Sequence, residues 1–243
     1  MNEVLRTSAA HVFVDDIIAP RLAPDDEHHL AKVLRLRDGE VVSCSDGIGN
    51  WRLVEWSRSA LVVGSSEDPG VHHEPRPAYE IAVAFVPVKG DRPEWAVQKL
   101  TELGVDCIVP LLPTRRAIVK WSGERLDKQL DKWRRVAREA AMQSRRTRLP
   151  VVEEFASLSD VCARPGAAVA DPDGSELGES SRLVIVGPEG GFDPGEVRND
   201  IPRVSLGDTI LRAETATLVA ATLLGHSRSA SAVRSTTGLQ RNG

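Results

Sequence analysis

Two glycine-marked loops near the end of the 243-residue chain hold the residues with the clearest chemical potential. The loop Gly187 to Gly191 follows the apolar run 183–186, and the loop 206–215 follows Val204 and Ser205. Each pattern predicts a strand that ends in a loop and leads into a helix, so both loops would line one pocket at the strand ends. Glycine lets backbone approach a ligand closely. Neither loop carries the Gly-Lys-Ser/Thr or GxGxxG pattern that binds nucleotide phosphates, which favours a flat, largely uncharged ligand.

Two charged residues in these loops are candidates for chemistry. Arg212 stands just before the last expected helix, where a cation opposes the helix dipole, and this indicates a task other than capping. Its structural alternative is an ion pair with Glu189 or Glu214. Glu189 is either a solvated loop carboxylate or helix cap, or it orders a ligand or the target group.

The composition is that of an ordinary globular protein, with 41% hydrophobic and 27% charged residues. No apolar run approaches the roughly 18 residues of a membrane span, and the start has no signal-peptide pattern, so we expect a cytoplasmic protein without membrane contact. Cys44, Cys107 and Cys162 are far apart and outside any CxxC pattern, which predicts reduced thiols and no metal. The net charge of -4 argues against general nucleic-acid coating, although arginines cluster between residues 134 and 148.

The first seventy residues predict a small, mostly antiparallel β-barrel-like module. Short alternating runs at 11–14, 40–44, 50–56 and 60–63 are separated by turn signals such as Asp38-Gly39, and one helix is expected over 26–34. The stretch 71–78 is rich in proline and charged or polar residues. We therefore expect domain 1–70, a linker over 71–78 and a second domain over 79–226.

The second domain has the alternation of strands and helices that predicts an α/β fold with a parallel sheet. Strands are expected over 80–86, 105–111, 167–170 and 183–186, and helices over 93–103, 123–143 and 214–224. Residues 171–174 predict a turn, while the run Asp193-Pro194-Gly195-Glu196 has the pattern of a helix N-terminus with a capping box. Gly225 is expected to end the last helix, and the polar tail 227–243 is expected to be disordered.

Five motifs in order resemble one known family. They are Lys89 to Arg92, Glu94 to Lys99, Thr101 to Val105, Gly187 to Gly191 and Leu211 to Ala216. Together they are similar to the bacterial methyltransferases that act on N3 of a uridine in 16S (small-subunit) ribosomal RNA, in the SPOUT class. His28 to Leu30 and Val33 to Gly39 resemble the PUA-like RNA-binding domain of that family, and the resemblance covers about residues 4–226.

The resemblance implies a C-terminal SPOUT α/β domain with a deep trefoil knot, an N-terminal PUA-like β-barrel and a homodimer. It implies S-adenosyl-L-methionine as the cofactor and 16S ribosomal RNA or the small ribosomal subunit as the partner. Arg212 and Glu189 become the catalytic candidates. The implied cofactor-binding residues are Gly187, Pro188, Glu189, Gly190, Gly191, Leu206, Gly207, Ile210, Leu211, Arg212, Thr215 and Ala216. For Thr215 and Ala216, a simple helix start would look the same.

Methylation of N3 requires loss of the imide proton and stabilisation of the charge that develops on the base oxygens. Arginine or backbone donors suit the second task, and water or Glu189 would take the proton, because no histidine is suitably placed in the sequence. Basic residues after the expected strands, after the helix expected over 123–143 and in the first domain are the candidates for phosphate contacts. They are Lys89, Arg92, Arg115, Arg116, Arg145, Arg146, Arg35 and Arg37.

The chain departs from the family pattern at two places. Relatives commonly have Glu-Gln-Ser-Gly-Arg where this chain has Met142 to Arg146, so that Arg145 replaces a glycine. The usual basic-aromatic pair before Phe13-Val14-Asp15 is weak, since Ala10, His11 and Val12 precede Phe13 and Arg6 is displaced. Two alternatives stay open: a SPOUT methyltransferase for another RNA base or for transfer RNA, and a ribosome-binding RNA chaperone without catalysis.

Overall fold

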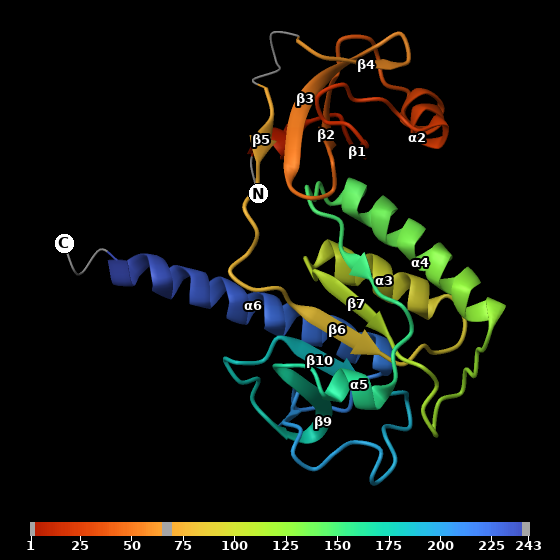
Figure 1. The fold of residues 1–243 in the computed structure, drawn as a ribbon, viewed down its shortest axis with the longest axis vertical. Coiled ribbons are helices and arrows are strands. Elements are labelled where there is room, and N and C mark those ends of the chain that lie inside the picture. Colours follow the sequence, from red (N-terminus) through yellow and green to blue (C-terminus); the bar gives the residue numbers. More distant parts are fainter. Residues whose placement is uncertain (1–2, 65–69, 240–243) are drawn as a thin grey trace. The chain divides into compact units, whose positions relative to one another are not determined.

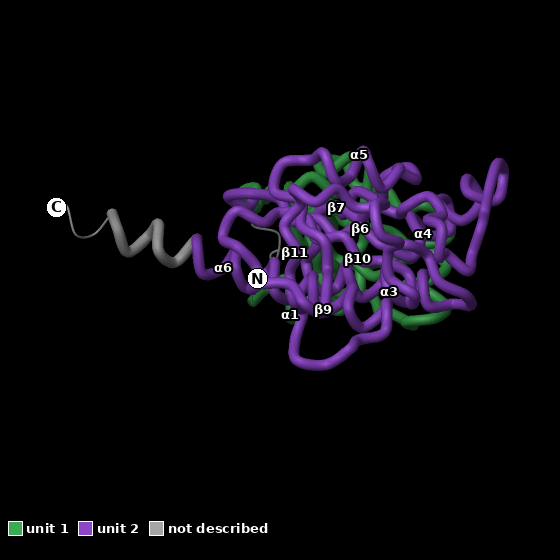
Figure 2. Tube along the Cα trace, turned by 90° about the horizontal axis from the view of Figure 1, so that it is seen from below, with its two compact units in different colours: residues 1–76, 138–149 green, residues 77–137, 150–243 purple. Residues whose placement is uncertain are grey.

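A computed structural model of the protein describes residues 3–64 and 70–239, with side chains as far as residue 231. The chain divides into two compact units, coloured separately in Figure 2. Unit 1 contains residues 1–76 and 138–149, and unit 2 contains residues 77–137 and 150–243. The change between units after residue 76 falls inside the stretch where a linker was expected. The second segment of unit 1 was not predicted.

Unit 1 contains a five-stranded sheet in the order β1-β2-β3-β4, with β5 also paired to β3. Its strands are β1 (Ala10–Phe13), β2 (Val41–Ser45), β3 (Asn50–Ser57), β4 (Ala60–Val62) and β5 (His72–His73). All pairs are antiparallel except β1 with β2. The expectation of a linker from residue 71 is wrong for β5, where the His72 ring stacks on Trp51 at 4.4 Å and the two residues pair in register.

Three short helical segments complete the first part of unit 1. They are α1 (Glu3–Thr7), α2 (Pro24–His28) and the π-helix His29–Val33. The single helix expected over 26–34 is therefore an α-helical turn that continues as a π-helix. Its apolar side reaches the core through Leu30, which is buried with Val42, Val54 and Trp56.

Helix α4 (Glu124–Gln143) passes from unit 2 to unit 1 at residue 138. It ends in a Schellman motif, because the Arg146 N–H donates to the Ala141 carbonyl at 2.9 Å and the Arg145 N–H to the Met142 carbonyl at 3.2 Å. Within unit 1, Arg138 pairs with Asp26 at 2.7 Å, and Ser45 Oγ donates to the Thr147 carbonyl at 2.7 Å. These contacts explain why residues 138–149 belong to the first unit.

Unit 2 is built on a six-stranded parallel sheet in the order β11-β9-β10-β6-β7-β8. Figure 1 labels β9, β10, β6 and β7 of this sheet. Its strands are β6 (Ala82–Phe85), β7 (Cys107–Pro110), β8 (Val151–Val152), β9 (Ala167–Ser175), β10 (Leu183–Val186) and β11 (Arg203–Val204). The parallel α/β fold predicted from the strand-helix alternation is confirmed. The chain adds β7 and β8 on one side of β6, and later places β10 on its other side.

Helices cover both faces of this sheet. Alternate residues of each strand point to opposite faces, so one strand contributes side chains to two cores. Val83 and Phe85 belong to the core shared with α3 (Arg92–Glu102), the unit 2 part of α4 and α6 (Ala213–Leu239). Ala84 and Val86 belong to the core shared with α5 (Leu158–Cys162) on the other face. Trp133 of α4 is fully buried, with its ring 5.9 Å from that of Phe85.

Two local predictions in unit 2 are wrong. Residues 171–174 are not a turn but part of β9, which continues to Ser175 beside β11. A Cβ on Gly174 would lie 2.6 Å from the Val204 backbone, so the glycine allows this pairing. No helix follows Asp193, although its N–H donates to Glu196 Oε2 at 2.7 Å as in a capping box. Gly195 adopts φ +84°, which turns the chain away from a helical path.

The end of the chain also differs from expectation. Helix α6 does not end at Gly225 but continues to Leu239, so the disordered tail predicted from residue 227 is wrong as far as residue 239. Residues 240–243 lie outside the described residues. Arg228 ties the extended helix to unit 2 through an ion pair with Asp106 and a 3.1 Å hydrogen bond to the Gly104 carbonyl. A polar composition was therefore a poor guide to disorder here.

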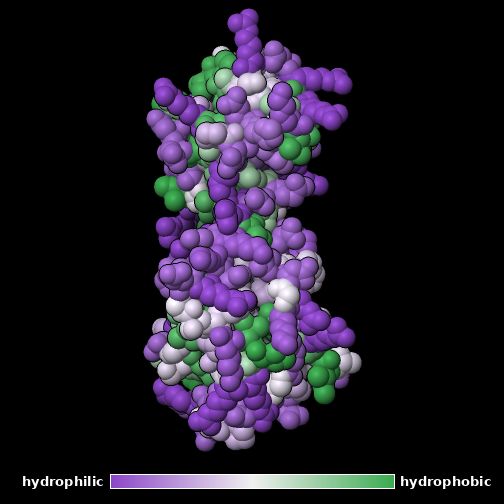
Figure 3. Space-filling view, turned by 90° about the vertical axis from the view of Figure 1, so that its right-hand side faces the viewer, coloured by the Kyte–Doolittle hydropathy of each residue, from purple (hydrophilic) through white to green (hydrophobic). Residues whose placement is uncertain are grey.

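Hydrophilic side chains dominate the face of the molecule in Figure 3, with hydrophobic ones in small groups among them. Large apolar side chains that are more than half exposed, such as Ile18, Ile48 and Ile210, are distributed along the whole chain. Within the described residues, no helix is both long and apolar enough to cross a membrane.

Candidate functional site

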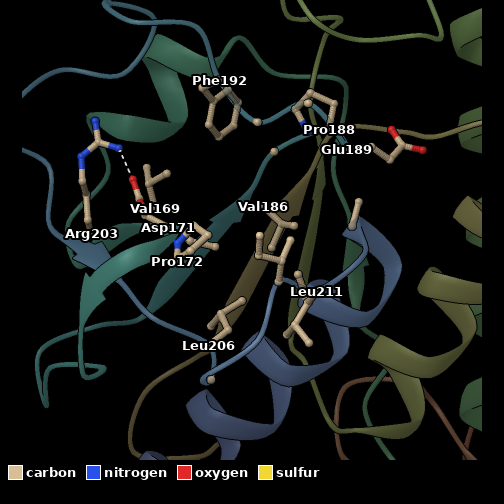
Figure 4. Close-up of a pocket in the computed structure, with 18 of the residues that line it drawn as sticks. Val169, Asp171, Pro172, Val186, Pro188, Glu189, Phe192, Arg203, Leu206 and Leu211 are labelled. Atoms are coloured by element: carbon tan, nitrogen blue, oxygen red, sulfur yellow. Dashed lines mark hydrogen bonds and ion pairs between the residues drawn. The ribbon is translucent and has the colours of Figure 1, made fainter.

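A cavity of about 370 Å³ lies in unit 2 beyond the carboxyl ends of three neighbouring strands (Figure 4). Three segments form its walls: 169–172 of β9, 186–192 at the end of β10, and 203–216 from β11 to the start of α6. Parallel strands place their carboxyl ends at one edge of a sheet, where ligands of α/β proteins commonly bind. The two glycine-marked loops thus line one pocket, as their sequence pattern predicts.

The first loop is held by packing and by the neighbouring segment after β7. A Cβ on Gly187 would lie 3.0 Å from the Phe192 ring, so glycine lets that ring fold back toward the loop. Arg116 donates to the Gly190 carbonyl at 2.7 Å and forms an ion pair with Asp193. The loop therefore keeps its shape through packing within it and through contacts with Arg116 outside the pocket lining.

The second loop combines two anchored apolar residues with an exposed tip. Leu206 and Leu211 pack against the main core of unit 2, whereas Ile210 between them is 88% exposed. Gly207 adopts φ +142°, a conformation that side chains rarely accept. Helix α6 then begins at Ala213, and Ala213 and Ala216 present small side chains to the cavity.

An ion pair forms one side of the pocket, where β9 meets β11 (Figure 4). Arg203 donates to Asp171 Oδ2 at 2.6 Å, while Asp171 Oδ1 accepts the Asp173 N–H at 3.0 Å. The hydrogen bond from the Asp173 N–H and the bond from Arg203 hold the pKa of Asp171 below its ordinary value. Asp171 is therefore ionised at neutral pH.

A second charged group joins the two loops outside the pocket. Arg92, at the start of α3, lies 3.9 Å from Glu189 and 3.5 Å from Glu214. These are the carboxylates considered in the sequence as partners of Arg212. Among the described residues, no partner of the exposed Arg212 side chain is found. The structural alternative for Arg212, an ion pair with either glutamate, is therefore not what the structure shows.

The sequence of the chain matches known protein families in both units. Residues 74–225 match a family described as the RNA methyltransferase domain, and residues 22–56 match the RNA methyltransferase PUA domain. The chain belongs to the RNA methyltransferase family. A relative in Mycobacterium tuberculosis, named ribosomal RNA small subunit methyltransferase E, is 34% identical over 228 residues, covering 83% of this chain and 84% of the relative.

Two further similar proteins support the assignment. A Bacillus subtilis protein of the same name is 30% identical over 230 residues, which cover 83% of this chain and 88% of the relative. A Legionella pneumophila methyltransferase, solved in complex with the bound cofactor SAM, is 26% identical with a TM-score of 0.76. That match covers 89% of this chain and 97% of the other.

Most residues that the resemblance assigned to cofactor binding surround the pocket of this RNA methyltransferase-family chain. Those that line it are Gly187, Pro188, Glu189, Gly190, Gly191, Leu206, Gly207, Ile210, Leu211 and Ala216. Arg212 and Thr215 do not line it, although their neighbours Leu211, Ala213 and Ala216 do. Their side chains are exposed at the start of α6. Direct cofactor contacts by Arg212 and Thr215 stay a prediction.

Sequence reasoning missed the wall formed by β9 and β11. Val169, Asp171 and Pro172 come from a stretch interpreted as a strand followed by a turn, and Arg203 from a two-residue strand. Hydrophobic periodicity in the sequence could not identify these lining residues, because the pairing of β9 with the short strand β11 brings them together. The capping-box pattern near Asp193 did mark the neighbouring loop, where the Arg115 N–H donates to Glu196 at 2.8 Å.

The predicted RNA-binding residues divide between the units. In unit 2, Lys89 and Arg92 follow β6, and Arg115 and Arg116 follow β7; all four are exposed. Arg92 and Arg116 already hold the pocket loops through the contacts described above, so they combine a structural task with any phosphate contact. Lys89 and Arg115 have no such structural task for their side chains among the described residues.

In unit 1, the two arginine pairs differ in exposure. Arg35 and Arg37 are exposed beside the π-helix, with Arg35 at φ +55°. Arg145 donates to the Ser8 carbonyl at 2.9 Å, and burial lowers its pKa. The Arg146 carbonyl accepts a hydrogen bond from His11 at 2.9 Å. Arg145 therefore serves the packing of unit 1, and its predicted phosphate contact would compete with that role.

The three cysteines of the chain lie outside the pocket lining. Cys44 and Cys162 are buried and Cys107 is partly buried, and all three are free thiols. Burial and a 2.9 Å hydrogen bond to Glu153 raise the pKa of Cys107. Within the part of the chain that the structure describes, no group of three or more His, Cys, Asp or Glu is placed to hold a metal ion.

Proposed function

We propose that this chain is an S-adenosylmethionine-dependent methyltransferase that modifies N3 of a uridine in 16S ribosomal RNA. The observation that carries the proposal is the pocket between the two glycine-marked loops, in a chain of the RNA methyltransferase family. Relatives named ribosomal RNA small subunit methyltransferase E support the substrate class. The Legionella relative with bound SAM supports the cofactor. The choice of uridine N3 rests on the sequence motifs.

The residues around the pocket fit such a cofactor. The volume of about 370 Å³ lies in the range of small-molecule sites, and the walls are mostly apolar side chains and glycine backbone. Adenine suits a narrow apolar slot with backbone donors and acceptors. The lining offers Arg203 as its cation, and this group is paired with Asp171, so the pocket lacks the cluster of positive charge that a triphosphate needs. S-adenosylmethionine would supply a methyl group bonded to a positively charged sulfur.

Two finer features of the fold belong to the same proposal. Residues from β10 to α6 would form a deep trefoil knot, with the last helix passed through a loop of the preceding chain. The sheet of unit 1 would form a PUA-like β-barrel, in agreement with the PUA match over residues 22–56. The chain would act as a homodimer.

The chemistry assigns separate tasks to Arg212 and Glu189. The Arg212 guanidinium is exposed beside the pocket wall, where its N–H groups can stabilise negative charge on the oxygens of a uracil that has lost its N3 proton. Glu189 lines the pocket, and it or a water molecule would accept that proton. Arg92 beside Glu189 would limit the mobility of this carboxylate. Positioning and charge stabilisation thus carry the reaction.

The direct test is a methyl-transfer assay with 16S ribosomal RNA, both naked and in assembled small subunits, followed by mapping of the modified nucleotide. N3-methyluridine at one position is the expected product. Methylation of another base or of transfer RNA would keep the cofactor and reject the target. Calorimetry without detectable binding of S-adenosylmethionine would reject the enzyme and favour a ribosome-binding chaperone.

The role of Arg212 has its own test. Arg212→Ala should reduce the single-turnover rate at saturating cofactor about 100-fold or more, in the range lost when a fixed oxyanion donor is removed. Stability should change by less than about 0.5 kcal/mol, because the side chain is exposed. Arg125→Ala, which removes an exposed arginine that lies over Trp121, is the control. An unchanged single-turnover rate in Arg212→Ala would exclude the proposed role.

A further inference from the structure

The ion pair between Asp171 and Arg203 belongs to the pocket but takes no part in the methyl transfer proposed for Arg212 and Glu189. Both residues line the cavity, and Figure 4 shows them on the side away from Glu189. Arg203 is 43% exposed and Asp171 23%, so the pair faces an open space rather than the core. The pocket therefore has one strongly polar side among largely apolar walls.

Both members of the pair keep hydrogen-bonding capacity for a ligand. A guanidinium has five N–H donors, and one of them is used in the 2.6 Å bond to Asp171 Oδ2. Each carboxylate oxygen has two lone-pair sites, and Asp171 accepts one bond at Oδ1 and one at Oδ2. The pair can thus donate to an anionic group and accept from a cationic group of the same molecule.

The charges of the lining residues complement a particular ligand. Arg203 is the cation among the described lining residues, and Asp171 and Glu189 are the carboxylates. S-adenosylmethionine carries one carboxylate, one ammonium and one sulfonium group. One positive and two negative groups in the pocket therefore meet the opposite set on the ligand. A zwitterionic amino-acid end fits a paired arginine and aspartate better than an apolar wall.

The local structure holds this pair in place before any ligand binds. β9 supplies Asp171, and β11 supplies Arg203, which pairs in register with Val169. Gly174 lets the two strands approach, and the Asp173 N–H orients the Asp171 carboxylate. A binding group that is already positioned loses little side-chain freedom when the ligand enters.

We propose that Asp171 and Arg203 bind the amino-acid end of S-adenosylmethionine, with Arg203 on the carboxylate and Asp171 on the ammonium. This inference rests on the proposed function, because it takes that cofactor as the ligand. It places the methionine part beside β9 and β11 and leaves the adenosine part to the two glycine-marked loops. The experiment distinguishes this role from two others. In one the pair would contact the ribose hydroxyls, and in the other it would only link the two strands.

The test compares two ligands by isothermal titration calorimetry on the full chain. S-adenosylhomocysteine contains the amino-acid end, and 5′-deoxy-5′-methylthioadenosine has the same adenosine part without it. The wild-type chain should bind the first more tightly. Arg203→Met and Asp171→Asn should each weaken S-adenosylhomocysteine binding about tenfold or more, while binding of methylthioadenosine changes less than about twofold.

The matched control is Arg198→Met, which removes a similar arginine-aspartate pair, with Asp200, outside the pocket lining. It should leave both affinities unchanged. Equal weakening of both ligands in the pocket variants would assign the pair to ribose or to structure, and unchanged binding would exclude it from the ligand; either result overturns the inference. Wild-type binding of neither ligand would instead overturn the proposed function itself. If Arg203→Met fails to fold, Arg203→Lys and Asp171→Asn provide the same ligand comparison.

Discussion

Arg145 occupies a backbone conformation that normally belongs to glycine. It is the C′ residue of the Schellman motif at the end of α4, with φ +58°, a position where glycine is the usual residue. The left-handed conformation costs a residue with a Cβ about 1 kcal/mol. Two hydrogen bonds from the Arg145 guanidinium, to the Ser8 carbonyl at 2.9 Å and the Ala9 carbonyl at 3.4 Å, offset this cost. The departure from the family pattern thus has a local explanation.

Substitutions at Arg145 separate the cost of the left-handed backbone from the contribution of the two hydrogen bonds. Arg145→Ala keeps the unfavourable φ and loses both hydrogen bonds, so we expect it to lower the free energy of unfolding by about 1–2 kcal/mol. Arg145→Gly loses the same bonds but relieves the backbone, and it should be more stable than the alanine variant by about 1 kcal/mol. Urea titration of both variants measures the difference. Equal stabilities would show that the backbone at residue 145 is not strained.

His11 should make unit 1 sensitive to acid. Burial lowers the pKa of His11 to about 4, against the opposing effect of the hydrogen bond to the Arg146 carbonyl. Between pH 6.5 and pH 4 the unfolded chain binds a proton that the folded chain excludes. The contribution of His11 to stability is therefore complete above pH 6.5 and is lost as the pH falls toward 4, by about 3 kcal/mol.

Urea unfolding at pH 7.5, 5.5 and 4.5 checks this, with the indole N–H signals of Trp51 and Trp56 reporting on unit 1. The control is His11→Gln, whose amide can still donate to the Arg146 carbonyl but does not titrate. Its stability should fall less steeply between pH 6.5 and pH 4 than that of the wild type. Parallel pH curves for the two proteins would contradict the prediction.

At the residue scale, the sequence predicts local features better than distant contacts. The positions of Gly187 and Gly207 follow from short patterns after apolar runs, and these patterns located the pocket. The partner of Glu214 could not be predicted, because Arg92 reaches it from the start of another helix. The link between Asp171 and Arg203 depends in the same way on strand register.

At the scale of elements, the pairing of β9 with β11 depends on one missing side chain. A Cβ on Gly174 would lie 2.6 Å from the Val204 backbone, which no rotamer change can relieve. Gly174→Ala should therefore separate β11 from β9 and destabilise unit 2 by about 1–3 kcal/mol. Because Arg203 lies on β11, affinity for S-adenosylhomocysteine should fall as well.

A second glycine on a regular element provides the control for Gly174→Ala. Gly225 lies inside α6, and a Cβ there would meet no atom within 4 Å. Gly225→Ala should thus stabilise the helix by about 0.5–1 kcal/mol, the opposite sign from the same substitution at Gly174. Thermal unfolding of both variants measures this contrast. Destabilisation by both substitutions would mean that Gly225 packs closely against a further chain.

Element types were predictable where a hydrophobic period was long, and element ends were not. The strands β6, β7 and β10 and the helices α3 and α4 follow from their periodicity. The end of α6 was missed because Gly225 has ordinary helical geometry there and Arg228 anchors the next turn on Asp106. Very short elements such as β8 and β11 carry no readable period, and they exist because a neighbouring strand pairs with them.

At the scale of the whole molecule, the parallel α/β fold was predictable because strands and helices alternate in the second half of the chain. Which residues make up unit 1 was not predictable from the sequence. Residues 138–149 follow a helix of unit 2 in sequence, and nothing in their residue types shows that they belong with the first seventy-six residues. A contiguous first domain is the natural prediction from sequence, and the structure replaces it with two separate segments.

This division predicts how fragments of the chain behave. A fragment of residues 1–76 lacks the Arg138 guanidinium that pairs with Asp26, which is 8% exposed, and the Thr147 carbonyl that accepts from Ser45. It also lacks the Arg146 carbonyl that accepts from buried His11. Losing one partner of a buried polar group costs about 1–3 kcal/mol each time. Because a small domain has only a few kcal/mol of stability, we expect this fragment to be largely unfolded.

Joining residues 138–149 to the fragment through a flexible glycine-serine linker should restore folding, because the polar partners return with the segment. Dispersed amide signals in a two-dimensional NMR spectrum would report the folded state, and the fragment without the segment should lack them. A matched fusion with Arg138→Met and Thr147→Val has the same length but lacks the ion pair and the Thr147 side-chain contact. It tests whether these contacts, and not only the longer chain, stabilise the folded unit. The Thr147 side chain donates a hydrogen bond to Glu74, so this variant removes that bond as well as the ion pair with Asp26. If the fragment 1–76 folds alone with the same stability as the fusion, residues 138–149 do not contribute to the folding of unit 1. The contiguous domain predicted from the sequence would then fold by itself.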